Sequence, residues 1–216
     1  MDSQPSVRRA EKSDQDAVLA AFTAGVLDDP VTVWLLAGQP AGPLLDGYAG
    51  QLIETSLRDA EIWIAGAGAE IWTVSIWQTI TSSERFRTEA EEIAARAARS
   101  PEAGPLRRSA YLTALLAREH PREFPYGYLH VIATVPQHRN RGAGAAILAR
   151  RARSLTGTRT SAFLKASSEQ SARLYTRHGF VRDKHTIPLP DDGPTLIPMW
   201  FRPARARSPL RRGGSW

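Results

Sequence analysis

Apolar residues recur along this chain with two spacings, and the changes between them divide it into expected strands and helices. Runs rich in β-branched and aromatic residues predict strands. These runs lie at 6–9, 60–65, 69–77, 126–135, 161–166, 180–187 and 195–201. Because the second and third runs are joined around Gly66-Ala67-Gly68, we expect them to form a hairpin.

Helical spacing fills most of the intervals between these runs. Residues 13–16 offer N-cap side chains for a helix that ends near Val26, and Leu112, Leu115 and Leu116 share one face of another helix. The expected helices cover 13–26, 83–100, 106–119, 142–155 and 168–178, with breaks at Pro101 and Pro105.

The order of these elements predicts the fold class. After the first helix come two strands, two helices, a strand–helix–strand–helix segment and two closing strands. This order is typical of a mixed α/β (α+β) protein. We expect one domain whose central, twisted, mixed sheet has about seven strands flanked by helices, and 216 residues suit a single domain.

Composition excludes several classes of protein. Hydrophobic residues make up 42% of the chain and charged residues 23%, as in globular proteins with a substantial core. No run approaches the roughly 18 uncharged apolar residues that span a bilayer, and the N-terminus does not resemble a signal peptide. Cysteine is absent, which excludes disulfides and thiolate chemistry. We therefore expect a cytoplasmic protein without a membrane partner.

The net charge of +6 is concentrated at the C-terminal end. Without the five arginines found there, the charge is 6 minus 5, or about +1. Because proline, glycine and serine surround them, we expect one folded domain over 1–202 and a basic, disordered tail over 203–216. The five arginines are Arg202, Arg205, Arg207, Arg211 and Arg212.

A glycine loop lies between the strand that ends at Val135 and the helix that begins at Gly142. Glycines let the backbone approach an anion closely, and a helix N-terminus directs free N–H groups and its positive dipole end at it. Arg139 and Arg141 add positive charge. The sequence therefore predicts a diphosphate site here, although a Gly-x-Gly motif by itself also fits an ordinary turn.

Two nucleotide-binding motifs do not fit this loop. A dinucleotide fingerprint requires a third glycine where Ile147 stands, and a nucleoside triphosphate loop requires Lys and Ser or Thr where Ala145 and Ala146 stand.

The loop resembles the acetyl-CoA motif of the GNAT superfamily of N-acetyltransferases, which is matched by Pro136, Arg139, Gly142 and Gly144. The segment 164–180, with its Leu-Tyr-x-x-x-Gly-Phe end, resembles the next strand and helix of that family. Across the whole chain the sequence looks closest to the branch that contains puromycin N-acetyltransferase and many actinobacterial relatives. Two positions depart from the family, which often has Asn at Ser168 or Ser171 and Glu at Lys165.

The resemblance implies a set of donor contacts and one catalytic role. It implies that acetyl-CoA is the co-substrate and that the Tyr175 phenol protonates the coenzyme A sulfur. The implied coenzyme-binding residues are Thr134, Val135, Arg139, Asn140, Arg141, Gly142, Ala143, Gly144, Ala145 and Ser168.

The base that accepts the amine proton is less defined. The strand 126–135 has no Asp or Glu, and alternation predicts that Tyr128, His130, Ile132 and Thr134 share one face. Imidazole titrates near neutral pH, so His130 is the candidate base, with a packing role as the alternative. His120 and His185 are expected to be exposed, and no histidine has a metal-ligand spacing. Trp34, Trp72, Trp77 and Tyr126 are candidate walls of an acceptor site or core residues.

These features predict an acetyl-CoA-dependent N-acetyltransferase that acts on the amine of a small molecule, such as an antibiotic or secondary metabolite, by direct attack through a tetrahedral species. An acyl donor such as aminoacyl-tRNA and a non-catalytic acetyl-CoA sensor are the alternatives. The sequence leaves the acceptor and the choice between monomer and homodimer open.

Overall fold

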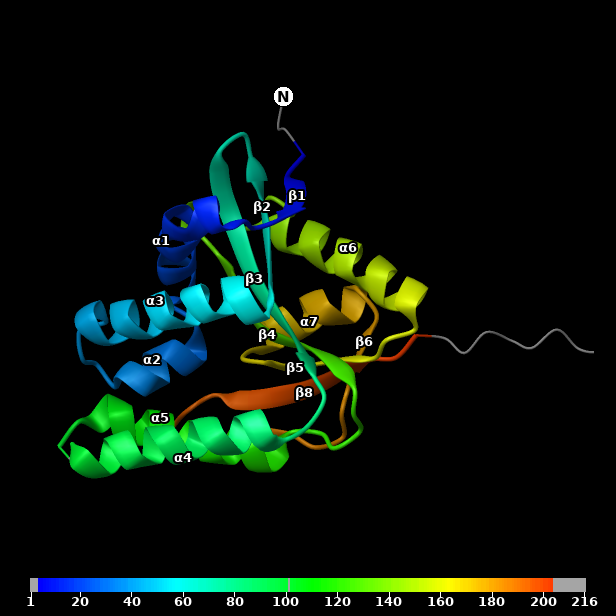
Figure 1. Ribbon diagram of the computed structural model, residues 1–216. Coiled ribbons are helices and arrows are strands. Elements are labelled where there is room, and N and C mark those ends of the chain that lie inside the picture. Colours follow the sequence, from blue (N-terminus) through cyan, green and yellow to red (C-terminus); the bar gives the residue numbers. More distant parts are fainter. Residues whose placement is uncertain (1–3, 101, 204–216) are drawn as a thin grey trace, which may run out of the picture.

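One mixed sheet lies between two layers of helices (Figure 1). The computed structural model describes residues 4–100 and 102–203. The strand order is β1-β2-β3-β4-β5-β8-β6, with β7 paired to β8, and within the described ranges only β4 and β5 run parallel to each other. The strands are β1 Ser6–Arg9, β2 Glu61–Ala67, β3 Glu70–Ile80, β4 Tyr126–Thr134, β5 Ala162–Ala166, β6 Phe180–Arg182, β7 Ile187–Pro188 and β8 Thr195–Phe201.

The helices divide between the two faces of the sheet. In Figure 1, α6 and α7 lie on one side and α1 to α5 on the other. Buried clusters follow this division: Val18 and Ile53 pack with Val74 on the α1–α3 face, whereas Leu148 and Tyr175 pack with Trp77 on the α6–α7 face. The helices are α1 Gln15–Val26, α2 Pro30–Leu36, α3 Gly42–Asp59, α4 Glu84–Arg99, α5 Gly104–Glu119, α6 Ala143–Thr158 and α7 Glu169–Arg177, with short 3-10 turns at Lys12–Asp14 and Pro136–His138.

The predicted fold class is confirmed, with two differences in its elements. The expected strand 180–187 is two short strands, so the sheet has eight strands in the part of the chain that the structure describes. Helices α2 and α3 occupy a segment for which the sequence pattern predicted no element. Of the proposed tail, only Pro203 is described. Arg202 pairs with Glu123 at 3.0 Å, so it belongs to the folded body.

Among the described residues, no single helix combines the length and apolar character needed to cross a membrane. The helical segments 12–26 and 30–36 reach this length and apolar character only when they are taken together, and an 84° bend separates them.

Candidate active site

Strands β4 and β5 pair only at their beginnings. The register matches Gly127 with Ala162 and Tyr128 with Phe163, and no further pairs follow along either strand. From Leu129 onward, β4 therefore has an unpaired edge toward β5. Because Val135 N–H bonds to the Trp72 carbonyl on β3, alternation turns the N–H of Thr134 toward this open edge.

A bulge in β4 lies where the two strands begin to diverge. Opposite β3, Leu129 pairs with Trp77 and Val131 pairs with Ile76, so His130 has no Cα partner. A bulge adds one residue to one strand and bends it locally. It also changes which face each later side chain occupies.

The predicted common face of Tyr128, His130, Ile132 and Thr134 is wrong because of this bulge. Tyr128 packs with Phe86 of α4, and His130 contacts Tyr48 of α3. Ile132 and Thr134 instead lie beside Gly144 of α6, on the opposite face of the sheet. Strict alternation holds only for an unbulged strand.

The start of α6 presents free backbone N–H groups beside this open edge. Its first helical hydrogen bond runs from Ala146 N–H to the Gly142 carbonyl, which leaves the N–H groups of Ala143, Gly144 and Ala145 without helical partners. Gly142 has φ +82°, and Asn140 also has a positive φ of 62°. The turn thus directs a row of donors outward, as an anion site requires.

The two arginines of the loop point in different directions. The Arg139 guanidinium donates to both carboxylate oxygens of Asp28, at 2.5 and 2.6 Å, and its Nε donates to the Thr134 carbonyl. The guanidinium holds the pKa of the Asp28 carboxyl below its usual value. Arg139 therefore fastens the loop to the end of α1, and its charge is already matched by a carboxylate.

Arg141 lies on the other side of the loop. Its guanidinium lies 4.0 Å from the centroid of the Trp72 ring and hydrogen-bonds His138 at 3.2 Å. His138 stacks on Trp72 and bonds Glu70 at 3.0 Å. This set of contacts holds Arg141 on the α6 face, next to the start of the helix.

Tyr175 lies across the open edge, on α7. Its side chain is 7% exposed and packs with the α6–α7 core. Burial raises the pKa of its hydroxyl, and the nearby Asp29 carboxylate adds to the shift, so the phenol stays protonated across the neutral pH range. A protonated phenol at this place can act as an acid.

The junction of β5 and α7 is fastened to the turn after α1. Ser167 donates to Asp29 at 2.6 Å, and Asp29 also accepts from the Val31 N–H as the N-cap of α2. The predicted coenzyme contact Ser168 forms the α7 capping box with Ser171, at 3.2 Å in each direction. Asp28 and Asp29 thus join both sides of the open edge to one turn.

His130 faces a group of aromatic and basic side chains, which we call the aromatic-basic cluster. Burial lowers the pKa of His130 to about 4, and the charges of Arg85 and Lys165 contribute. An imidazole with this pKa is neutral at pH 7 but holds a proton weakly, which makes it a poor general base. The cluster consists of His120, Tyr128, His130, Phe163 and Lys165.

The expected exposure of His120 is wrong, whereas His185 is exposed as expected. His120 is 6% exposed, stacks on Phe86 and hydrogen-bonds the Tyr126 hydroxyl at 3.0 Å. The chain turns back after α5 and places the ring beneath β4. Burial lowers the pKa of His120 to about 2, so it is neutral.

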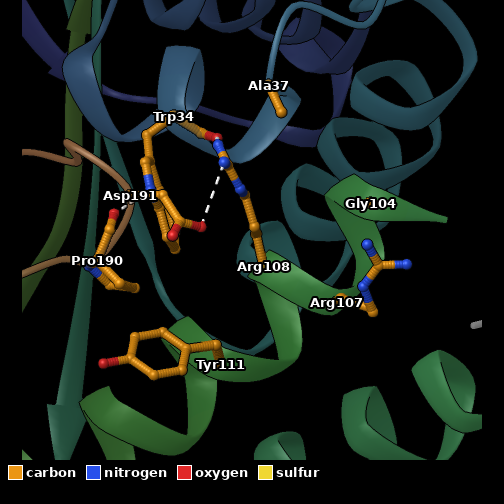
Figure 2. Close-up of a pocket in the computed structure, with 8 residues that line it drawn as sticks. All are labelled: Trp34, Ala37, Gly104, Arg107, Arg108, Tyr111, Pro190 and Asp191. Carbon is orange, nitrogen blue, oxygen red and sulfur yellow. Dashed lines mark hydrogen bonds and ion pairs between the residues drawn. The ribbon is translucent and has the colours of Figure 1, made fainter.

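A separate pocket of about 350 Å³ lies between α2, the start of α5 and the loop before β8 (Figure 2). Figure 2 shows Arg108 extending from α5 to Trp34 and Asp191; it donates to the Trp34 carbonyl at 2.5 Å and to Asp191 at 3.4 Å. Trp34 thus lines a pocket, whereas Trp72, Trp77 and Tyr126 are core residues with at most 2% exposure. The pocket contains none of the predicted catalytic or coenzyme-binding residues.

The structure gathers most of the predicted site residues around the open edge, and it adds others that the sequence did not single out. Tyr48 was missed because its helix was missed, although Leu45, Ala49 and Ile53 recur there at helical spacing. The contact between Ser167 and Asp29 had no signal in the sequence, because 138 residues separate the two side chains. Within the described ranges, no group of His, Asp or Glu could hold a metal ion.

Comparisons with known proteins identify a related domain and related folds. A family model described as the acetyltransferase (GNAT) domain matches residues 110–182, a segment that includes every predicted catalytic and coenzyme-binding residue. None of the curated proteins matches the chain.

Solved structures share the fold over nearly the whole chain. A Corynebacterium glutamicum ATCC 13032 protein, described as histone acetyltransferase HPA2 and related acetyltransferase, is 24% identical with a TM-score of 0.68, covering 94% of this chain and 98% of that one. Polyamine N-acetyltransferase from Drosophila melanogaster is 15% identical, with a TM-score of 0.59 and coverages of 92% and 99%. Arylalkylamine N-acetyltransferase 2 from Aedes aegypti is 14% identical, with a TM-score of 0.65 and coverages of 93% and 99%.

The chain therefore has the GNAT fold. Together with the domain match, this fold supports an acyltransferase enzyme, and acetyltransferase domains of this kind use acetyl-CoA.

Proposed function

We propose that this protein, with its acetyltransferase domain match and GNAT fold, transfers the acetyl group of acetyl-CoA to the amine of a small molecule by direct attack. The observation that carries the proposal is the opening between β4 and β5, with the N-terminus of α6 on one side and Tyr175 on the other. An anion site and an acid thus lie at one unpaired strand edge.

The donor side of the site fits a diphosphate with an extended arm. The free N–H groups of Ala143, Gly144 and Ala145 suit the phosphates, with Asn140 and Arg141 beside them. The N–H of Thr134, turned toward the open edge, suits a carbonyl of the extended arm. The N–H of Val135 cannot serve this purpose, because it is bonded to the Trp72 carbonyl on β3. Val135 instead continues the strand past Thr134.

The proposed chemistry needs an acid for the leaving sulfur. Tyr175 keeps its proton at neutral pH because burial raises its pKa, and it is thus suited to protonate the thiolate as the carbon–sulfur bond breaks. The Arg139–Asp28 pair and the Ser167–Asp29 bond hold the two walls of the opening in place. The role of Arg139 in this proposal is to hold the loop in position, because its guanidinium is paired with Asp28.

The acceptor we propose is an arylalkylamine. At the edge of the aromatic-basic cluster, Tyr48 is 50% exposed and lies 3.4 Å from the His130 ring, so these two rings offer faces to an aromatic body. A polyamine would bring further ammonium groups toward the Arg85 guanidinium, which lies near His130 and repels them. We also propose, from the resemblance to the puromycin N-acetyltransferase branch, that the natural acceptor is an antibiotic or secondary-metabolite amine.

A panel of amines tests this proposal through release of the coenzyme A thiol. Tyramine, phenethylamine and puromycin are compared with spermidine and agmatine at equal concentrations. We expect turnover with the aromatic amines that exceeds polyamine turnover by at least tenfold in kcat/KM. Acetyl-CoA binding without thiol release for any amine would support the sensor alternative instead.

A further inference from the structure

The Lys165 amine is buried and has no hydrogen-bond partner among the described residues. Its Nζ lies 4.8 Å from the centroid of the Phe163 ring and 5.6 Å from that of Tyr128. A lysine ammonium carries three donors and is strongly hydrated in water. Burying it without acceptors disfavours the charged form, so this environment favours the neutral amine.

Lys165 also lies where β4 and β5 begin to separate. The last paired residues are Tyr128 and Phe163, and two residues further along each strand are His130 and Lys165. Along β5, Leu164 and Ala166 pack on the α6–α7 face of the sheet. Because successive side chains of a strand alternate between faces, Phe163 and Lys165 face the α3–α5 layer. Lys165 and His130 therefore flank the opening on one face, which is the face proposed for the acceptor.

We propose that Lys165 accepts the proton from the attacking amine, a role that rests on the acetyl transfer proposed above. Its four-carbon stem lets Nζ swing from the Phe163 ring toward the opening without moving β5. The neutral amine has a lone pair and no competing partner. His130, on the neighbouring strand β4, orients the acceptor amine through its imidazole.

The acetyl transfer moves one proton to Lys165 and one proton from Tyr175. The lone pair of the acceptor nitrogen forms the carbon–nitrogen bond, and the carbonyl π electrons move to oxygen. The nitrogen proton passes to Nζ of Lys165, which becomes an ammonium. The carbonyl then re-forms, the carbon–sulfur bond breaks, and the sulfur takes the Tyr175 proton. Lys165 returns its proton to solvent before the next cycle, and solvent reprotonates Tyr175.

The electrostatic setting of Lys165 agrees with this role. Burial lowers the pKa of its amine to about 7, and the Glu119 carboxylate opposes the shift. A base with a pKa near the working pH is the most effective one, whereas His130 with a pKa of about 4 is too weak. The titratable and charged groups around it are Tyr128 and His130 on β4, Arg85 and Glu89 on α4, Glu119 on α5, His120 after it, and Tyr48 on α3.

Nuclear magnetic resonance measures the protonation of Lys165 without any need for turnover. The chain has three lysines, Lys12, Lys165 and Lys184, so protein labelled with 13C-lysine gives three ε-methylene signals. Lys12 and Lys184 are exposed and act as internal controls. We expect the signal that is lost in Lys165→Met to titrate near pH 7, well below the signals of the two control lysines. A Lys165 signal that titrates together with those two would overturn the proposal.

Kinetics test the role itself with an amine that the wild-type protein acetylates. We expect kcat/KM to rise with pH through a limb near 7. Lys165→Met and Lys165→Arg should each lower kcat on the order of 100-fold or more and abolish that limb, because neither side chain can take up a proton at neutral pH. Their dissociation constants for acetyl-CoA should stay within twofold of wild type, which shows that both variants fold.

Two further variants serve as controls for the effect of replacing Lys165. Lys184→Met should behave as wild type, and His130→Gln should lose less activity than Lys165→Met and keep the limb near pH 7. A Lys165→Met protein that keeps this limb, or keeps kcat within threefold, would overturn the role of Lys165 and leave the proposed function intact. If wild-type protein acetylates no amine, both proposals fail.

Discussion

Arg139 and Asp28, which are 111 residues apart in the sequence, form an ion pair in which the guanidinium donates to both carboxylate oxygens at 2.5 and 2.6 Å. The pair joins the loop before α6 to the turn after α1. Asp29, the next residue, joins the same turn to the start of α7 through Ser167. One acidic dipeptide therefore sets the distance between the two walls of the opening.

Replacing Asp28 should loosen the loop before α6. We expect Asp28→Asn to weaken acetyl-CoA binding several-fold, measured by calorimetry, while Asp46→Asn, on the exposed surface of α3, leaves it unchanged. The pair is largely exposed, so its contribution to stability is only about 0.5 kcal/mol. Wild-type affinity in Asp28→Asn would contradict the bracing role.

The same ion pair predicts a dependence of stability on pH. Arg139 lowers the pKa of Asp28 in the folded state, so the pair stabilises the protein above the unfolded pKa of about 3.9. This contribution is lost as the pH falls through the lower folded pKa. The difference in Tm between wild type and Asp28→Asn should therefore be present at pH 6 and shrink progressively as the pH falls below about 3.9.

Gly142 tests the turn that exposes the α6 donors. Its φ of +82° is unfavourable for alanine by about 1–2 kcal/mol. Gly142→Ala should lower the free energy of unfolding by roughly that amount and weaken acetyl-CoA binding at least tenfold. Gly157→Ala, later in the same helix and with open space around the added methyl group, should be neutral or stabilising. Equal behaviour of the two variants would count against the proposed anion site.

Gly25 tests the close packing of α1 on β4. A Cβ at this position would lie 3.0 Å from the Ala133 Cβ and 3.1 Å from the Thr134 nitrogen. We expect Gly25→Ala to lower the free energy of unfolding in urea by about 1–3 kcal/mol. Gly47→Ala, in α3 with nothing within 4 Å of the added methyl group, is the matched control and should not destabilise the protein.

Tyr175 is the proposed acid, and its variant separates binding from turnover. Tyr175→Phe removes only the hydroxyl, so we expect kcat to fall by about 100-fold while the acetyl-CoA dissociation constant stays within twofold. Tyr111→Phe, at the pocket of Figure 2, should leave both quantities unchanged. A Tyr175→Phe protein with wild-type kcat would assign the acid role elsewhere.

The sequence predicted the second half of the fold well because local patterns define it. The loop from Pro136 to Gly142 follows a strand of branched and aromatic residues, and the helices after it have caps and apolar faces. Helix α3 escaped prediction because Gly38, Pro40, Gly42 and Pro43 at its start are typical of a loop.

The features that the sequence did not predict depend on distant contacts. The bulge at His130 arises from the pairing of β4 with β3, and it moved Ile132 and Thr134 to the face opposite Tyr128. The burial of His120 depends on how the chain re-enters the sheet after α5. Neither property has a signal in the spacing of nearby residues.

Transfer of a 13C-labelled acetyl group to an amine distinguishes an N-acetyltransferase from a protein that only binds acetyl-CoA. Purified protein is incubated with [13C]acetyl-CoA and an aromatic amine such as tyramine or puromycin, and the amine is analysed by mass spectrometry beside a Tyr175→Phe reaction. We expect labelled N-acetyl product in the wild-type reaction, formed at a rate that falls by about 100-fold in the variant. Bound [13C]acetyl-CoA that yields no labelled amine from any acceptor of the panel would contradict it.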